Sequence, residues 1–102
     1  MHPWGITPEL EERFRELASA KTVRGVLILN SDGAPIKTNM DPKSTEAFAG
    51  MMHDIVGGAR RTFLEQDPNN DLTFVRFKLK KHEIMVAPDK QFLLVVVHHP
   101  QD

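Results

Sequence analysis

The 102-residue chain is long enough for one domain with one hydrophobic core and too short for two. Its formal net charge of -1 argues against a generic nucleic-acid binder, which carries a strong basic excess. It has no cysteine, which excludes disulfides and thiolate metal sites and is compatible with an intracellular location. The longest apolar run, residues 92–97, is far too short to cross a bilayer as a helix, and the amino terminus lacks a secretory signal pattern. We therefore expect neither nucleic acid nor a membrane as a partner.

The first predicted helix follows an amino-terminal tail, residues 1–6, that carries Trp4. Thr7 is suited to be its N-cap, and Pro8 suits the first helical position. The stretch TPELEERFRELASA is therefore predicted as an amphipathic helix. Its apolar stripe consists of Leu10, Phe14 and Leu17.

The next segment changes from helical to extended periodicity. Residues 26–29 are aliphatic, Asp32-Gly33 is typical of a hairpin turn, and residues 36–38 resume an extended pattern. Pro35 has no N–H to donate, so the second strand of this hairpin is expected at a sheet edge and the first strand in the interior.

A second, longer helix is predicted from Asp41, as N-cap with Pro42 behind it, to a turn at Asp67-Pro68. On a helical wheel one side of it forms an apolar arc of roughly 180°, whereas a surface helix needs about 100°. One neighbouring sheet does not account for so broad a face. The members of the arc are Phe48, Ala49, Met51, Met52, Ile55, Val56, Gly58, Ala59, Thr62 and Phe63.

Three further strands complete the predicted elements. Residues 71–80 alternate, with Thr73, Val75, Phe77 and Leu79 on one side and Leu72, Phe74, Arg76 and Lys78 on the other. Charges on one side are typical of an edge strand. Residues 82–99 predict a hairpin whose last strand, 92–97, is apolar throughout and belongs at the sheet centre. The elements predict one α+β domain over residues 7–100, with a five-stranded, mainly antiparallel sheet covered by helices.

The histidines do not form a recognisable metal site. HEIMV at His82 begins like a helical zinc motif, but its fifth position is Val86 and the segment is predicted as a strand. His98 and His99 are adjacent on a strand and point to opposite faces, so we expect solvated strand-end side chains.

Catalysis has equally little support. His53 is expected to be an exposed helix residue. A small hydrolase using His53 or His82 is motivated only by their neighbours Asp54 and Glu83, and adjacent residues do not converge. We expect no enzymatic activity, no cofactor, no metal and no small-molecule substrate.

Gly57-Gly58 precedes Arg60 and Arg61, a pattern that suggests an anion site. The glycines lie in the middle of the predicted helix, where backbone amides are already bonded, so a phosphate site is not predicted. Gly58 lies at the rim of the apolar arc, where a missing side chain lets another backbone approach. Gly57 points away from the arc, and the sequence provides no reason for it.

Three stretches are similar to the roadblock family of cytoplasmic dynein light chains. They are GVLILNSDGAPIKTNMD (residues 25–41), the pair Met52-His53, and DPNNDLTFVRFKLKKHEIMVAPDKQFLLVV (residues 67–96). The succession of NDLTFVR and EIMVAPDK is the specific part, because core patterning alone would not place Asp71, Pro88 and Asp89 at this spacing.

The resemblance implies a roadblock-like (profilin-like) sandwich and a non-catalytic homodimer, in which the second helix and the third strand's edge join two sheets into one ten-stranded sheet. It implies binding to the dynein intermediate chain, a role in microtubule-based transport and cargo linkage, and a cytoplasmic, cytoskeleton-associated location. Related proteins of this fold form scaffolds for small GTPases. A scaffold or regulator of a small GTPase is therefore the alternative function.

The resemblance also implies where the dimer and partner interface lies. The sequence does not decide which of its residues face the sister subunit, the partner or their own sheet, and Met51 fits an interface and a core contact equally. The chain departs from the family pattern in its amino-terminal extension and in the glycine pair. The interface residues are Met51, Met52, Ile55, Gly58, Ala59 and Phe63 in the helix and Leu72, Phe74 and Arg76 in the strand.

Overall fold

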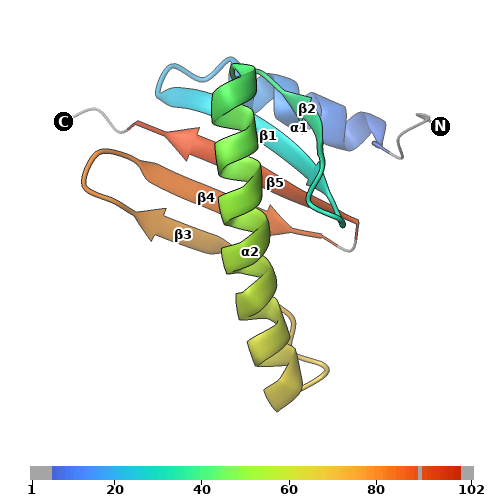
Figure 1. Ribbon diagram of the computed structural model, residues 1–102. Helices are drawn as coiled ribbons and strands as arrows, with labels where there is room; N and C mark the ends of the chain where they lie inside the picture. The colour runs from blue at the N-terminus through green and yellow to red at the C-terminus, as the bar shows by residue number, and fades with distance from the viewer. Residues whose placement is uncertain (1–5, 90, 100–102) are drawn as a thin grey trace.

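The computed structural model describes residues 6–89 and 91–99. Its elements follow the predicted order (Figure 1) and are α1 (Pro8–Ala18), β1 (Val23–Asn30), β2 (Pro35–Thr38), α2 (Pro42–Gln66), β3 (Val75–Lys78), β4 (Glu83–Pro88) and β5 (Phe92–His98). The strands form one sheet in the order β2-β1-β5-β4-β3 with antiparallel pairing throughout. The predicted fold is confirmed, including the central position of β5 and the edge position of β2.

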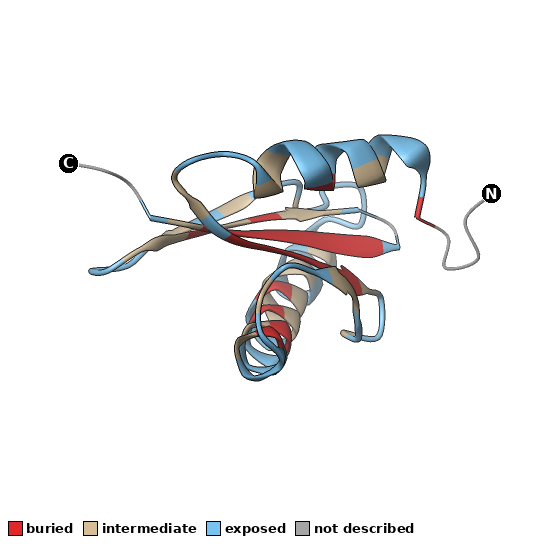
Figure 2. Ribbon diagram, turned by 90° about the horizontal axis from the view of Figure 1, so that it is seen from above, coloured by how far each residue is buried: buried red, intermediate tan, exposed pale blue. Residues whose placement is uncertain are grey.

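The two helices cover opposite faces of the sheet (Figure 2). The side chains of β1 and β5 alternate between these faces, which explains why residues 26–29 of β1 and 92–97 of β5 are apolar without interruption. Beneath α1 lies a cluster formed by Ile6, Phe14, Val26, Ile28, Phe92 and Leu94. Beneath α2 lies a second cluster formed by Leu27, Leu29, Ala49, Met52, Val56, Ile84, Val86, Leu93 and Val95.

Both helices begin as predicted. The Thr7 hydroxyl accepts a hydrogen bond from the Leu10 N–H at 3.1 Å, and the Asp41 carboxylate accepts one from the Ser44 N–H at 2.8 Å. The Ser44 N–H is the main cause that lowers the pKa of Asp41. These side chains satisfy amides that have no partner within the helix.

The predicted tail falls almost entirely outside the described residues, Trp4 included. Its last residue, Ile6, is 2% exposed and packs in the cluster beneath α1. The packed part of the chain therefore begins at least one residue before the predicted domain start.

The turn between β1 and β2 explains the burial of His53. Gly33 has φ +86°, which favours glycine, and the Asn30 side chain accepts hydrogen bonds from two backbone N–H groups of the turn, at 3.0 and 2.9 Å. The His53 ring packs against this turn so closely that a Cβ atom on Gly33 would lie 2.7 Å from it. His53 is therefore half-buried, with a side chain that is 42% exposed, and it is less exposed than predicted.

The third predicted strand is shorter than expected. Only Val75–Lys78 pair with β4, while residues 71–74 have no strand structure. Without the strand period, Leu72 lies on the same side as Val75 and Phe77 and packs with them against the cluster beneath α2. The prediction that Leu72 faces away from these residues is therefore wrong.

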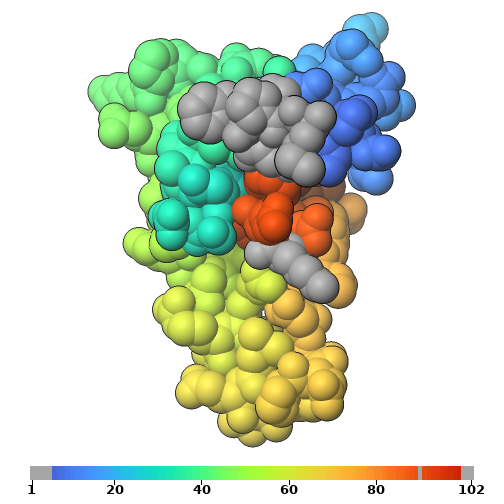
Figure 3. All heavy atoms as spheres, turned by 90° about the vertical axis from the view of Figure 1, so that its right-hand side faces the viewer, coloured from blue at the N-terminus to red at the C-terminus, as the bar shows by residue number. Residues whose placement is uncertain are grey.

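The carboxyl-terminal turns of α2 project past β3, the edge of the sheet (Figure 1). The space-filling view from the side shows these turns and the following loop standing out from the rest of the molecule (Figure 3). No helix in the described part of the chain has the length and apolarity needed to span a membrane.

Candidate dimer and partner surface

One flank of α2 carries large apolar side chains that the chain itself does not cover. Met51 is 44% exposed, Ile55 is 50% exposed and Phe63 is 51% exposed. They follow each other at intervals of one and two helical turns, with the half-buried Ala59 between the last two. We call this set, Met51, Ile55, Ala59 and Phe63, the apolar flank.

Phe63 continues the core-facing line of α2. It lies about two turns after Val56 and about three turns after Met52, so all three residues share the core-facing line of the helix. Val56 and Met52 are 0% and 2% exposed, whereas Phe63, which belongs to the carboxyl-terminal turns of α2 that project past β3 (Figure 1), is 51% exposed. Phe63 therefore lies at a core-facing position of α2, but the chain leaves half of it exposed.

The open edge of the sheet lies beside this flank. Among the described strands, β3 pairs with β4 on one side and has no partner on the other. Phe74, directly before β3, is 51% exposed. The opposite edge strand, β2, begins with Pro35, which has no N–H to donate to an added strand. The β3 edge is the one better suited to pairing with another chain.

The remaining predicted interface residues have other contacts. Met52 is 2% exposed within the chain's own core, so its side chain is not available to a partner, whereas Leu72 is half-buried and packs against that core. Arg76 is exposed, and its Nε lies 3.6 Å from a Glu83 carboxylate oxygen. Gly58 is half-buried, and its carbonyl accepts a hydrogen bond from the Thr62 hydroxyl at 2.9 Å.

An ion pair that sequence reasoning missed ties the projecting part of α2 to the following loop. Arg60 donates two hydrogen bonds to Asp71, Nε to Oδ1 at 3.0 Å and Nη2 to Oδ2 at 2.6 Å. The hydrogen bond to Asp71 is the main cause that raises the pKa of Arg60, and the charge of Asp89 makes a smaller contribution. The hydrogen bond from Arg60 is also the main cause that lowers the pKa of Asp71. Arg60 therefore interacts with both Asp71 and Asp89, two residues of the stretch that resembles the roadblock family.

The histidines have structural contacts. His98 is half-buried, and its Nε2 lies 2.8 Å from the Thr22 hydroxyl, so the prediction of a solvated side chain is wrong for this residue. The His82 ring packs edge-on against Phe48 with the ring centroids 6.2 Å apart. His53 Nδ1 lies 3.7 Å from a carboxylate oxygen of the neighbouring residue, Asp54. Within the described residues, no group of His, Asp and Glu could hold a metal ion.

The fold and this surface define a small α+β domain with an uncovered apolar helix flank beside an open strand edge. The model of the Roadblock/LC7 domain matches residues 9–98, and the chain therefore belongs to the Roadblock/LC7 domain family.

Solved structures support the same fold. The chain is similar to a Roadblock/LC7 domain from Streptomyces avermitilis, with TM-score 0.72 and 16% identity over 81% of this chain and 71% of that one. It is similar to the gliding protein MglB from Thermus thermophilus, with TM-score 0.70 and 14% identity over 87% and 70%. A structure of MglB with a tetrameric arrangement gives TM-score 0.67 and 15% identity over 86% and 71%. At such identities the likeness establishes the fold alone. The roadblock resemblance is thus confirmed, whereas the dynein light-chain assignment stays a prediction.

Proposed function

We propose that the protein is a non-catalytic adaptor that forms a homodimer through the apolar flank of α2 and the edge of β3, and that the dimer binds another polypeptide. The observation that carries this proposal is Phe63, which lies on the core-facing line of α2 but is 51% exposed. A second copy would supply the missing cover. Similarity in fold to a protein with a tetrameric arrangement agrees with self-association.

The energetics favour such a contact. Removing the apolar flank and Phe74 from water gains roughly 25 cal/mol per Å² of apolar area. Pairing two β3 edges would satisfy backbone groups that otherwise bond to water. A stable interface buries about 800 Å² per partner, so the helix flank and the strand edge have to contribute together.

Sedimentation equilibrium at micromolar concentrations tests the dimer. We expect the wild type to be a dimer and Phe63→Glu to shift it to monomer, because the interface would bury an unpaired carboxylate. Ile55→Lys should act in the same direction. Glu46→Lys is the matched control: Glu46 is exposed on the other flank of α2, and its replacement should leave the dimer intact. A monomeric wild type would refute the proposal.

The first candidate for the partner is a small GTPase, with the protein as its scaffold or regulator. The sequence resemblance supplies this candidate through proteins of the same fold. The structures named above include gliding proteins, and they fit this candidate better than the motor one.

The second candidate is the dynein intermediate chain, with the protein as a light-chain subunit in microtubule-based transport. One observation favours it: the stretches NDLTFVR and EIMVAPDK resemble dynein light chains. The Arg60–Asp71 pair and the charge of Asp89 give part of these stretches a structural role. A cytoplasmic location belongs to both candidates, and association with the cytoskeleton belongs to the second.

Affinity purification with the wild type and with Phe63→Glu as bait distinguishes the two candidates. Direct binding is then measured with purified small GTPases, loaded with GDP or GTP, and with intermediate-chain segments. Nucleotide-dependent GTPase binding that Phe63→Glu abolishes would support the scaffold. Binding of intermediate-chain segments without response to any GTPase would support the light chain and dismiss the scaffold.

A further inference from the structure

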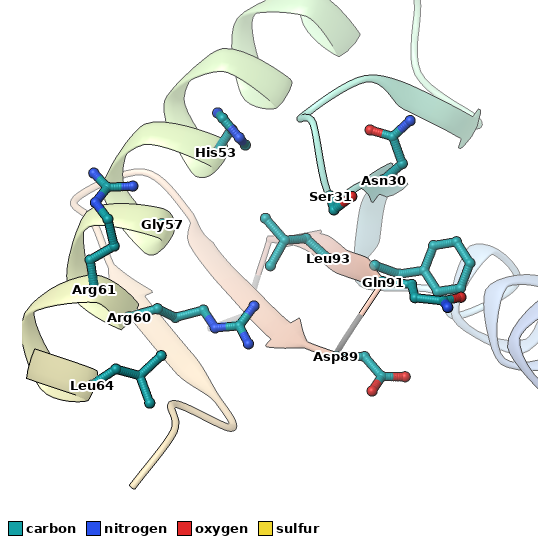
Figure 4. A pocket seen from close by; sticks show the side chains of 11 residues that line it. Asn30, Ser31, His53, Gly57, Arg60, Arg61, Leu64, Asp89, Gln91 and Leu93 are labelled. Carbon is teal, nitrogen blue, oxygen red and sulfur yellow. The ribbon is translucent and has the colours of Figure 1, made fainter. Parts of the chain in front are cut away.

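A pocket of about 270 Å³ lies on the flank of α2 opposite the apolar flank. His53, Arg60 and Arg61 line it from α2, and Asn30 and Ser31 line it from the end of β1 (Figure 4). The start of β5 forms the remaining wall. Because the pocket and the apolar flank lie on different sides of the helix, a dimer formed through the apolar flank would leave the pocket open.

The glycine pair determines where the Arg61 side chain lies. A Cβ atom on Gly57 would lie 3.6 Å from Arg61 Nη1, and one on Gly58 would lie 3.8 Å from Arg61 Nη2. The guanidinium therefore lies over the two glycines, where a longer side chain at either position would compete for its space. Gly57 itself lines the pocket, which gives this residue the role that the sequence did not reveal.

The two arginines of the pocket differ in their partners. Arg60 is held by Asp71 at 2.6 Å and also interacts with Asp89, the one acidic residue among the described residues that line the pocket. Arg61 is exposed and has no hydrogen bond or ion pair within the described part of the chain. Within the described residues, Arg61 is therefore a cation of the pocket lining without an ion-pair partner.

The size of the pocket limits its ligand. Sites for drug-sized molecules measure about 300–1,000 Å³ and enclose most of the ligand, whereas this pocket is smaller and open. Leu64 and Leu93 form an apolar part of the pocket wall, which suits the methylene groups of a ligand side chain. The Arg61 guanidinium suits a carboxylate at the end of that side chain. A single acidic side chain of a polypeptide matches both the volume and the charge.

We propose that this pocket receives a glutamate or aspartate side chain of a partner polypeptide, with Arg61 as its main ion-pair partner. The inference rests on the proposed function only in that the partner is a polypeptide. It concerns a different side of α2 from the dimer contact.

The test is a titration of the ¹⁵N-labelled protein, followed by NMR, with a nine-residue peptide that carries two glutamates. We expect saturable shifts of the backbone amides of Ser31, His53 and Gly57, and weaker binding as salt is added. The same peptide with glutamines in place of the glutamates should bind at least about threefold more weakly.

Variants of the protein assign the binding to the pocket. Arg61→Gln should weaken glutamate-peptide binding by at least about threefold. Gly57→Leu should do the same, because its side chain occupies the space of the guanidinium while leucine remains a good helix former. Lys43→Gln is the control, since Lys43 is exposed near the start of α2 and away from the pocket. The amide spectrum of each variant shows whether it is folded.

Several results would overturn the inference: unchanged affinity in Arg61→Gln, equal affinity for the glutamine peptide, shifts that cluster outside the pocket, or no saturable shifts. Inorganic phosphate that causes the same shifts and displaces the peptide at lower concentration would overturn the assignment to a side chain. The proposed function and the pocket inference are refuted by different results. A dimer without a peptide response refutes only the pocket, whereas a monomer with the peptide response refutes only the dimer.

Discussion

Gly57 and Gly58 do not interrupt α2, which runs from Pro42 to Gln66 as one helix. Among the described residues the one glycine with positive φ is Gly33. A methyl group on Gly57 would make an ordinary contact with Arg61 at 3.6 Å. We therefore expect Gly57→Ala to raise the free energy of unfolding by up to about 1 kcal/mol, the difference in helix propensity. Urea denaturation measures this change, and a loss of stability would show that the helix is distorted at this position.

Gly33→Ala should lower the free energy of unfolding. The φ of +86° strains any residue with a Cβ, and that Cβ would lie 2.7 Å from Cγ of His53, an atom that cannot move without the whole ring. We expect a loss of about 1–3 kcal/mol in the same denaturation experiment. If Gly33→Ala is neutral, the His53 ring does not pack on the turn as described.

The residues that sequence reasoning placed correctly are those whose role is local. Thr7 and Asp41 cap their helices through bonds to residues three positions ahead, and such patterns are visible in the sequence. The position of Gly57 in the pocket lining was missed because it depends on the direction of the Arg61 side chain and on the end of β1, which only the tertiary structure brings together.

At the scale of elements, the main discrepancy is the start of the third strand. The alternation of residues 71–80 predicted a long strand, but the chain from 71 to 74 does not pair with β4, and Asp71 is bonded to Arg60 of α2 instead. The sequence contains both charges but does not show that they meet across the turn that follows α2. Leu72 packs against the same cluster as Val75 and Phe77, whereas the alternation predicted that it faces away from them.

The Arg60–Asp71 pair predicts a dependence of stability on pH. The pKa of Asp71 is lowered in the folded state by Arg60, so the folded state binds this proton less tightly than the unfolded state. The stabilisation is present above the unfolded pKa of about 3.9 and is lost as the pH falls through the folded value. We expect Asp71→Asn to lower the melting temperature slightly at neutral pH, by an amount that shrinks below about pH 4.

Circular dichroism melting curves from about pH 7 to about pH 3 measure this difference. Asp32→Asn provides the control, because the same chemical change is made at an exposed turn residue. A difference between wild type and Asp71→Asn that grows toward acid would contradict the proposed role of the pair.

At the scale of the whole molecule, the sequence predicted the order of elements and the places of β2 and β5 in the sheet, because Pro35 and the apolar run 92–97 constrain them. It also predicted that α2 is too apolar for one neighbour. It did not predict where α2 leaves the sheet, since that depends on the packing of Met52 and Val56. The exposure of Phe63 follows from that packing.

If a second copy covers Phe63, folding and association are linked, and the melting temperature has to depend on protein concentration. A hundredfold rise in concentration adds about 2.7 kcal/mol to the stability of a dimer, which corresponds to several degrees in a protein of this size. We expect this rise for the wild type and for the control Glu46→Lys. Phe63→Glu should melt at a lower temperature that is independent of concentration. A wild type whose melting temperature does not change over this range would show that Phe63 stays exposed in solution.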